Sequence, residues 1–229
     1  MLVNINNSFS IFADRNICVW MDPWLESANY GSWAALYKAS QFEDFIRDCT
    51  YPLPDIVYIS HLHTDHYDVE FLNFLKQHCD LRILIKDFRD GRLKKRITEE
   101  VNPKEIVCIN QYEYNEIQNT KFMIVPQISA SSADEENQLE YDLDTSLIIE
   151  TEDTIIFNEV DNPLHVDDYI QNVLPNSGWN NVKNKTKIGL IGYSGASDYP
   201  QSYLGIDRLM ERQKVIDKTI RRFGKWLNC

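Results

Sequence analysis

Short apolar runs alternate along the chain with stretches in which apolar residues recur at helical spacing. Runs of about four to eight apolar and β-branched residues, bounded by turn-forming residues, are typical of strands. They predict strands over residues 2–12, 16–21, 55–60, 81–86, 105–110, 115–126 and 145–157, with turns at residues 14–16 and 152–153. Helical periodicity predicts helices over residues 41–48, 68–78, 92–101 and about 202–227. Strands and helices in this alternating order are typical of α/β proteins.

The helix predicted at about residues 202–227 is amphipathic and basic. Its apolar residues recur at helical spacing, and its basic residues outnumber its acidic ones. The basic residues are Arg208, Arg212, Lys214, Lys218, Arg221, Arg222 and Lys225, against Asp207, Glu211 and Asp217. Two interpretations stay open: a solvated face on a packed terminal helix, or a docking surface for a phosphorylated ligand or an acidic partner.

Length and composition favour one large domain over residues 1–229. Of the 229 residues, 43% are hydrophobic and 12% are aromatic, which supports a substantial core. Apolar runs fall well short of the ~20 residues that span a bilayer, and no secretory segment is recognisable, so we expect no membrane association. The net charge of −12 argues against a general nucleic-acid binder, because phosphate backbones are bound by basic surfaces.

Cysteine usage points to a reducing compartment. The chain has 5 cysteines, and this odd number without close spacing argues against a disulfide framework. None of them is spaced for an iron–sulfur cluster. We therefore expect a cytoplasmic protein, and the sequence carries no signal for its oligomeric state.

The strongest chemical signal directly follows the strand predicted at residues 55–60. His61, His63 and His66 fall within six positions together with Asp65, and the whole chain has only 5 histidines. Imidazole nitrogen and carboxylate oxygen are ligands of zinc, iron and manganese. The end of a strand holds such groups on a rigid support. Three solvated loop histidines are the alternative, but this clustering favours a metal site.

The order His61, His63, Asp65, His66 after an apolar strand resembles the His-x-His-x-Asp-His signature of the metallo-β-lactamase superfamily. Further segments look like elements of its lactonase-like and CMP-N-acetylneuraminate hydroxylase-like members. These segments are residues 21–25 with 30–33, residues 158–162, and residues 193–200. The resemblance covers nearly the whole chain and implies an αββα sandwich, with one or two metals at the edge where the two sheets meet.

The chain departs from the superfamily pattern at two places. Many members supply a histidine to the first metal from the segment aligned with residues 122–129, and another to the second metal near residues 193–199, and this chain has neither. The remaining metal-ligand candidates are His61, His63, Asp65, His66, Asp161 and His165. Asp161 follows an apolar strand and is the bridging candidate. Helical spacing would put His165 on the same face as Asp161.

The ligand set predicts a metal-dependent hydrolase that acts on a small ester, lactone or phosphodiester, including those derived from carbohydrates. A divalent metal, most commonly zinc in such sites, with manganese or iron as alternatives, lowers the pKa of bound water from 15.7 to about 7. The resemblance implies that Asp65 binds metal and positions the nucleophile. Tyr67 is a candidate proton donor, although a tyrosine beside a turn is more often a packing residue.

Two other functions stay open. The hydroxylase resemblance indicates an iron-dependent reaction on a nucleotide sugar, with electrons from a separate Rieske-type partner. The missing histidines indicate a non-catalytic binding module. The polar segment over residues 129–144 is a predicted loop on the metal-bearing side, where it either covers the substrate or is a plain surface insertion.

Overall fold

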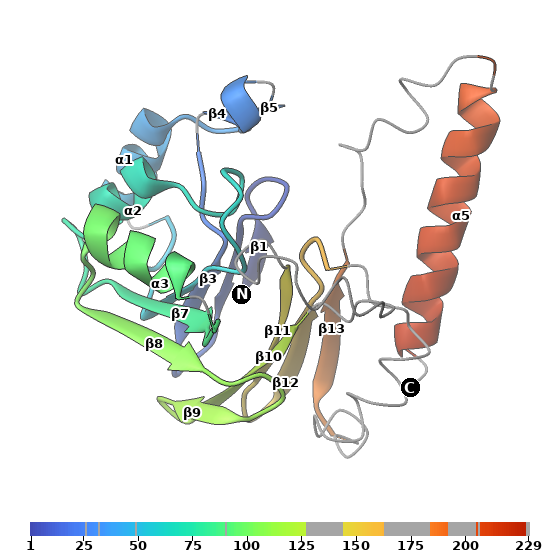
Figure 1. The fold of residues 1–229 in the computed structure, drawn as a ribbon. Coiled ribbons are helices and arrows are strands. Elements are labelled where there is room, and N and C mark those ends of the chain that lie inside the picture. Colours follow the sequence, from blue (N-terminus) through green and yellow to red (C-terminus); the bar gives the residue numbers. More distant parts are fainter. Residues whose placement is uncertain are drawn as a thin grey trace.

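Two β-sheets face each other and carry helices on their outer sides (Figure 1). The computed structural model describes residues 1–25, 27–31, 33–48, 50–89, 91–126, 144–162, 184–191, 205 and 207–227. The helix–sheet–sheet–helix order confirms the predicted α/β sandwich. None of the helices in this described part combines the length and apolar character that a bilayer crossing requires.

The first sheet has the strand order β1-β2-β3-β6-β7-β8. Its strands are β1 (Leu2–Asn4), β2 (Ser10–Ala13), β3 (Cys18–Met21), β6 (Ile56–Tyr58), β7 (Arg82–Lys86) and β8 (Glu105–Ile109). The strands from β1 to β3 pair antiparallel, and those from β3 through β8 pair parallel. The loops that follow the parallel strands therefore leave the sheet at one edge.

The second sheet has the strand order β13-β12-β11-β10-β9. Its strands are β9 (Asn115–Ile117), β10 (Thr120–Pro126), β11 (Thr145–Glu150), β12 (Thr154–Asn158) and β13 (Thr186–Leu190). The pairs are antiparallel except for β12 with β13. A small pair, β4 (Ser27–Ala28) with β5 (Trp33–Ala34), encloses the 3-10 helix η1 (Asn29–Gly31).

Alternation along the strands of the first sheet builds two cores. Trp20 and Val57 face the helices, whereas Met21 and Tyr58 face the second sheet, and all four are fully buried. This follows from the period of two along a strand. The helix-side core lies under α1 (Ala39–Arg47), α2 (Val69–Leu75) and α3 (Arg92–Arg96), which continues as the π-helix η2 (Ile97–Val101).

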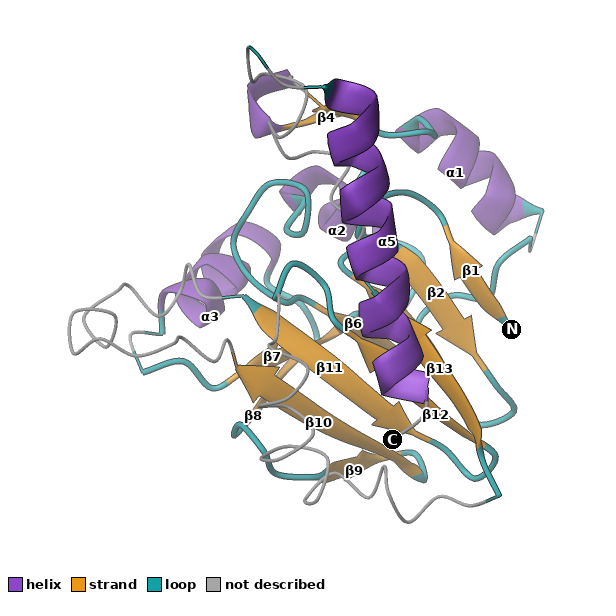
Figure 2. Ribbon diagram, turned by 90° about the vertical axis from the view of Figure 1, so that its right-hand side faces the viewer, coloured by secondary structure: helices purple, strands orange, loops and turns teal. Residues whose placement is uncertain are grey.

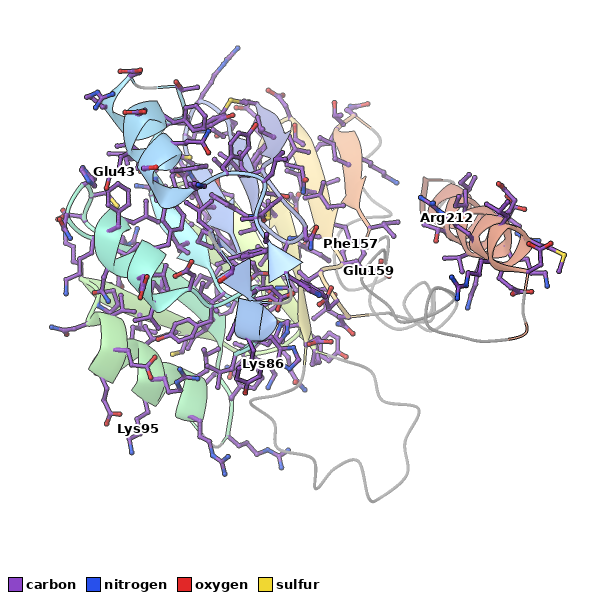
Figure 3. All side chains as sticks on the ribbon, turned by 90° about the horizontal axis from the view of Figure 1, so that it is seen from above. Glu43, Lys86, Lys95, Phe157, Glu159 and Arg212 are labelled. Atoms are coloured by element: carbon purple, nitrogen blue, oxygen red, sulfur yellow. The ribbon has the colours of Figure 1, made fainter. Side chains whose placement is uncertain are left out.

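The last described helix, α5 (Arg208–Leu227), lies on the outer side of the second sheet and contacts β13 (Figure 2). Figure 3 shows Arg212 on this helix well apart from Phe157 of β12. Several of its apolar side chains are open to solvent, including Leu209 at 81% and Ile220 at 63% exposure. The part of the chain from Arg208 confirms a long C-terminal helix.

The predicted elements are mostly confirmed, with their bounds corrected. The predicted strand at residues 2–12 is two strands, because residues 5–9 form a turn closed by the Ile5 amide on the Phe9 carbonyl. The predicted strand at residues 115–126 is also two, since Gln118 and Asn119 adopt left-handed backbone conformations between them. The small β4–β5 pair and β13 were not predicted.

Candidate metal centre

The histidine cluster lies in the turn between β6 and α2. The amides of His66 and Tyr67 both donate to the carbonyl of His63, which folds the segment back on itself. The ring of His61 consequently lies 4.4 Å from that of His63 and 4.1 Å from that of His66, between centroids. Asp68 then caps α2 by accepting from the Phe71 amide, so the turn is anchored at both ends.

A first group of ligand atoms surrounds His61. Its Nε2 atom lies 2.8 Å from Nδ1 of His63 and 3.2 Å from Oδ1 of Asp144. His61 is fully buried, His63 is exposed, and the Asp144 side chain is 17% exposed. Asp144 directly precedes β11 and was not among the predicted ligands. The ligand atoms of these three residues lie within 4.8 Å of one another.

A second group of ligand atoms surrounds His66. Its Nε2 atom lies 3.1 Å from Oδ2 of Asp161 and 3.4 Å from Oδ2 of Asp65. His61, His66 and Asp161 again offer ligand atoms within 4.8 Å of one another. The structure therefore brings together His61, His63, Asp65, His66 and Asp161 as predicted. The remaining candidate, His165, lies outside the described residues.

A buried aspartate beneath the cluster orients two of the rings. Asp22, which has a φ of 46° at the end of β3, accepts from the Ser60 amide at 2.7 Å and from the Ser60 hydroxyl at 2.8 Å. Its Oδ2 atom also lies 3.1 Å from Nδ1 of His66. Ser60 Oγ lies 2.9 Å from Nδ1 of His61. Because the hydroxyl hydrogen is used on Asp22, Ser60 accepts from His61.

Both rings are thereby held in one orientation, with a hydrogen on Nδ1. His61 leaves its Nε2 unprotonated beside Asp144, whereas His66 directs its Nε2 at Asp161, a contact that either a hydrogen or a cation can bridge. This is the arrangement of a metal-binding histidine, whose other nitrogen donates to an oriented partner. Neither Asp22 nor Ser60 was a predicted site residue. Their adjacency depends on the parallel pairing of β3 with β6, which spacing in sequence does not reveal.

One hydrogen-bonded chain joins the two sheets directly at the cluster. Thr145, the first residue of β11, donates its hydroxyl to the Ser60 carbonyl at 2.8 Å. The Tyr58 hydroxyl lies 2.6 Å from the same Thr145 oxygen, and all three residues are buried. The contact sets β11 against the end of β6. Asp144, one residue before Thr145, is consequently held beside His61.

Asp161 is placed by an unusual turn after β12. Val160 has a φ of 55°, a left-handed conformation that is an outlier for a β-branched residue. Asn162 on the other side of Asp161 is fully buried and donates its side-chain amide to Ser146 Oγ at 3.0 Å. The Ser146 hydroxyl in turn donates to the Glu159 carbonyl. Strain of this kind persists where the surrounding structure enforces it, which is common at functional sites.

The ionisation of the two rings differs sharply. Burial, and then the charges of the neighbouring histidines, holds the pKa of His61 well below its usual value. Burial alone would also lower the pKa of His66, but the charge of Asp22 and the hydrogen bond with Asp161 outweigh it and raise that pKa well above the usual value. The cluster thus attracts positive charge at His66, where a metal cation would take the place of the proton.

The donor atoms fit a bound cation. Asp144 Oδ1 is buried and, within the described part of the chain, no donor makes a hydrogen bond to it. His61 Nε2 lies 3.2 Å away but has no hydrogen to give, so two lone pairs face each other. Burial and the charge of Asp161 raise the pKa of Asp144 to about 6. A divalent cation between these atoms would satisfy both lone pairs.

Tyr67 occupies a different environment. Its ring is buried in the helix-side core, and its hydroxyl donates to Glu100 Oε2 at 3.0 Å. Arg96 lies over the ring, 5.3 Å from its centroid, and pairs with Glu100 at 2.9 Å. The hydroxyl is therefore engaged by η2 and not by the histidines. We assign Tyr67 a packing role in place of the predicted proton donor.

Comparison with solved structures identifies neighbours of the same fold at low sequence identity. An isothiocyanate hydrolase from Delia radicum gut bacteria aligns with 95% of this chain and 92% of its own, with 15% identity and a TM-score of 0.56. CmlA, a diiron beta-hydroxylase from Streptomyces venezuelae, aligns with 75% of this chain, with 18% identity and a TM-score of 0.55. This chain covers only 32% of the CmlA chain.

A metallo-beta-lactamase fold protein from Bacillus subtilis aligns with 67% of this chain and 54% of its own, with 15% identity and a TM-score of 0.42. No protein-family model matches the chain, and no curated protein matches it significantly.

Proposed function

We propose that the chain is a metal-dependent hydrolase of small electrophilic substrates, since it shares its fold with an isothiocyanate hydrolase over nearly its whole length. One observation carries the proposal. Two hydrogen-bond-oriented imidazoles, on His61 and His66, direct their Nε2 atoms at carboxylates from the second sheet, at 3.2 and 3.1 Å. Such a convergence of imidazole nitrogens and carboxylate oxygens is the chemistry of a cation site.

Each group of donors has a distinct part in the proposal. His61, His63 and Asp144 would hold one cation, and His66, Asp161 and Asp65 would hold or orient a second. A bound divalent metal supplies Lewis acidity, which polarises the electrophile and lowers the pKa of a bound water to about 7. His63 and Asp161 are the exposed members, so solvent and substrate reach the cluster from their side.

Asp65 is suited to orient the attacking water. Burial would raise its pKa, but the hydrogen bond with His66 and the charge of that ring lower the pKa overall. The group is therefore a carboxylate at neutral pH and accepts a hydrogen bond from a water near His66. The Ser8 hydroxyl donates to the backbone carbonyl of Asp65, which fixes this residue from the N-terminal hairpin.

The substrate class is proposed from the fold neighbours and from the chemistry of the site. The nearly full-length alignment with an isothiocyanate hydrolase supports a small, neutral electrophilic carbon as the target. Lactones and esters present a comparable carbon, and a phosphodiester presents a phosphorus that a Lewis acid also activates. A panel of a γ-lactone, an aryl ester, an aryl phosphodiester and benzyl isothiocyanate covers these possibilities.

The test compares two histidine variants of the metal-loaded protein. His61→Ala removes a buried ring at the centre of the cluster, whereas His78→Ala removes an exposed ring that packs on Phe74 at the end of α2. We expect His61→Ala to reduce kcat/KM at least about a hundredfold and to lower the bound metal, and His78→Ala to change neither. Full activity in His61→Ala would overturn the proposal.

A second function is favoured by the number of carboxylates at the site. Asp144 lies beside His61, and Asp65 and Asp161 lie beside His66. Oxygen-rich donor sets suit iron and manganese better than zinc. The fold is shared with a diiron beta-hydroxylase, so the alternative is an iron-dependent hydroxylation that needs molecular oxygen and electrons from a separate donor. Oxygen uptake by the reduced, iron-loaded protein, with labelled oxygen in the product, would favour it over hydrolysis.

A further inference from the structure

We infer that Asp144 is the third protein ligand of the cation held by His61 and His63, and that this two-histidine, one-carboxylate set shifts the metal preference of the site from zinc toward iron(II). The inference rests on the metal site of the proposed function and specifies it further. Its support comes from Asp144 itself, which the sequence did not single out.

The position of Asp144 is fixed independently of any metal. Thr145, its neighbour in the chain, is fully buried and donates to the Ser60 carbonyl at 2.8 Å. Thr145 also begins the register of β11 against β10, opposite Pro126. These contacts hold the backbone at Asp144 beside the cluster. Its carboxylate lies 3.2 Å from His61, between Oδ1 and Nε2.

One oxygen of this buried carboxylate accepts no hydrogen bond from the described part of the chain. The side chain is only 17% exposed, and no hydrogen bond reaches its Oδ1 atom within the described residues. A buried carboxylate without a partner is unfavourable by several kcal/mol in general. The unprotonated Nε2 of His61 faces it, and Nδ1 of His63 lies 2.8 Å from that Nε2 atom. A cation in contact with all three would remove the penalty.

The chain offers no imidazole at this place. Residues 127–143, which connect β10 to β11, contain no histidine, and neither β10 nor β11 contains one. A carboxylate at Asp144 therefore completes a ligand set that imidazole cannot complete. Zinc accepts either three imidazoles or two imidazoles and one carboxylate, whereas non-haem iron(II) with open positions is typically held by two imidazoles and one carboxylate.

The inference concerns relative and not absolute affinity. Zinc binds more tightly than iron(II) to most nitrogen and oxygen sites, so the chain is not expected to reverse that order by itself. Exchange of an imidazole for a carboxylate lowers the ratio of the zinc affinity to the iron(II) affinity, because iron(II) binds the harder carboxylate oxygen relatively better than zinc does. The measurable quantity is the ratio of the zinc affinity to the iron(II) affinity.

The experiment uses metal-free full-length protein, titrated anaerobically with zinc and separately with iron(II), each in competition with a chromogenic chelator. Four proteins are compared: wild type, Asp144→Asn, Asp144→His and the control Asp153→Asn, an exposed aspartate in the turn after β11. We expect Asp144→Asn to weaken both metals at least about tenfold, and Asp144→His to raise the zinc to iron(II) ratio at least about tenfold. Asp153→Asn should match wild type.

Wild-type affinities in Asp144→Asn, or an unchanged ratio in Asp144→His, would overturn the inference. Should Asp144→Asn fail to fold by circular dichroism, Asp144→Glu, which keeps the carboxylate, and Asp144→His decide between the outcomes. Failure of the inference stays separable from failure of the proposed function. If His61→Ala abolishes metal binding while Asp144→Asn does not, only the inference is wrong, and if wild type binds neither metal, the proposed function is wrong as well.

Discussion

The carboxylate of Asp22 lies 3.1 Å from Nδ1 of His66, a contact between residues 44 positions apart. Asp22 is fully buried, and its other interactions go to Ser60, which in turn orients His61. This single carboxylate therefore sets the tautomer of two rings. It touches neither of the exposed members of the cluster, so it is a positioning residue.

Replacement of this carboxylate by an amide tests the positioning role. Asp22→Asn keeps the shape but removes the charge that holds the Nδ1 hydrogen of His66 in place. We expect metal affinity to fall about tenfold to a hundredfold. The amide also lacks one of the two acceptor oxygens that Asp22 directs at Ser60 and His66, so the metal-free variant should lose some stability as well. The measurements are metal titration and urea unfolding, and an unchanged metal affinity would contradict the role.

The left-handed turn at Val160 leads to a second prediction. Proline cannot adopt a positive φ, so Val160→Pro should displace Asp161 and weaken the metal held with His66. Glycine adopts the observed φ of 55° without strain, so Val160→Gly should keep the metal affinity of wild type. Metal titration of the two variants checks the pair. Equal metal affinities in Val160→Pro and Val160→Gly would show that Asp161 does not contribute to metal binding.

Tyr67 provides a test that distinguishes packing from catalysis. Tyr67→Phe removes the hydrogen bond to Glu100 and keeps the ring in the helix-side core. We expect the free energy of unfolding to fall by about 1 kcal/mol, the usual net worth of one hydrogen bond, and kcat/KM to stay the same. Urea denaturation and steady-state kinetics measure both. A tenfold loss of kcat with unchanged stability would restore Tyr67 as a proton donor.

The contact of Glu100 with Tyr67 and Arg96 predicts a pH dependence of the unfolding free energy. The hydrogen bond from Arg96, and then that from Tyr67, holds the pKa of Glu100 below its usual value, although partial burial opposes this. Because the pKa is lowered in the folded state, the stabilisation by ionised Glu100 is fully present above the unfolded pKa of about 4.3. It is lost as the pH falls through the folded pKa. The difference in unfolding free energy between wild type and Glu100→Gln should therefore shrink on acidification below about pH 4. A difference that grows there would contradict the contact.

Much of the fold was predictable because it depends on local periodicity. A continuous apolar run marks a strand buried on both faces, and the β3 and β6 segments show such runs without interruption. The β4–β5 pair escaped prediction because each strand has only two residues. The weak strand β13 escaped as well, since it contains Lys187 and Gly189 among its five residues.

The candidate site likewise has residues that the sequence predicts and residues that only the folded chain brings together. His61, His63 and His66 were predicted as candidate ligands because they lie together in sequence. Asp144 was not predicted, because its place beside His61 depends on a contact between Ser60 and Thr145 across 85 positions. The one local signal was a carboxylate directly before a strand, whereas Asp161 follows its strand by three residues.

The central claim is that one cluster of imidazoles and carboxylates from both sheets binds a cation. Anomalous diffraction from crystals of the metal-loaded protein, recorded on both sides of the metal absorption edge, tests it most directly. We expect a peak about 2.0–2.3 Å from His61 Nε2, His63 Nδ1 and Asp144 Oδ1. Well-diffracting crystals with no peak among these atoms, or a peak bound only by surface residues elsewhere, would contradict the claim.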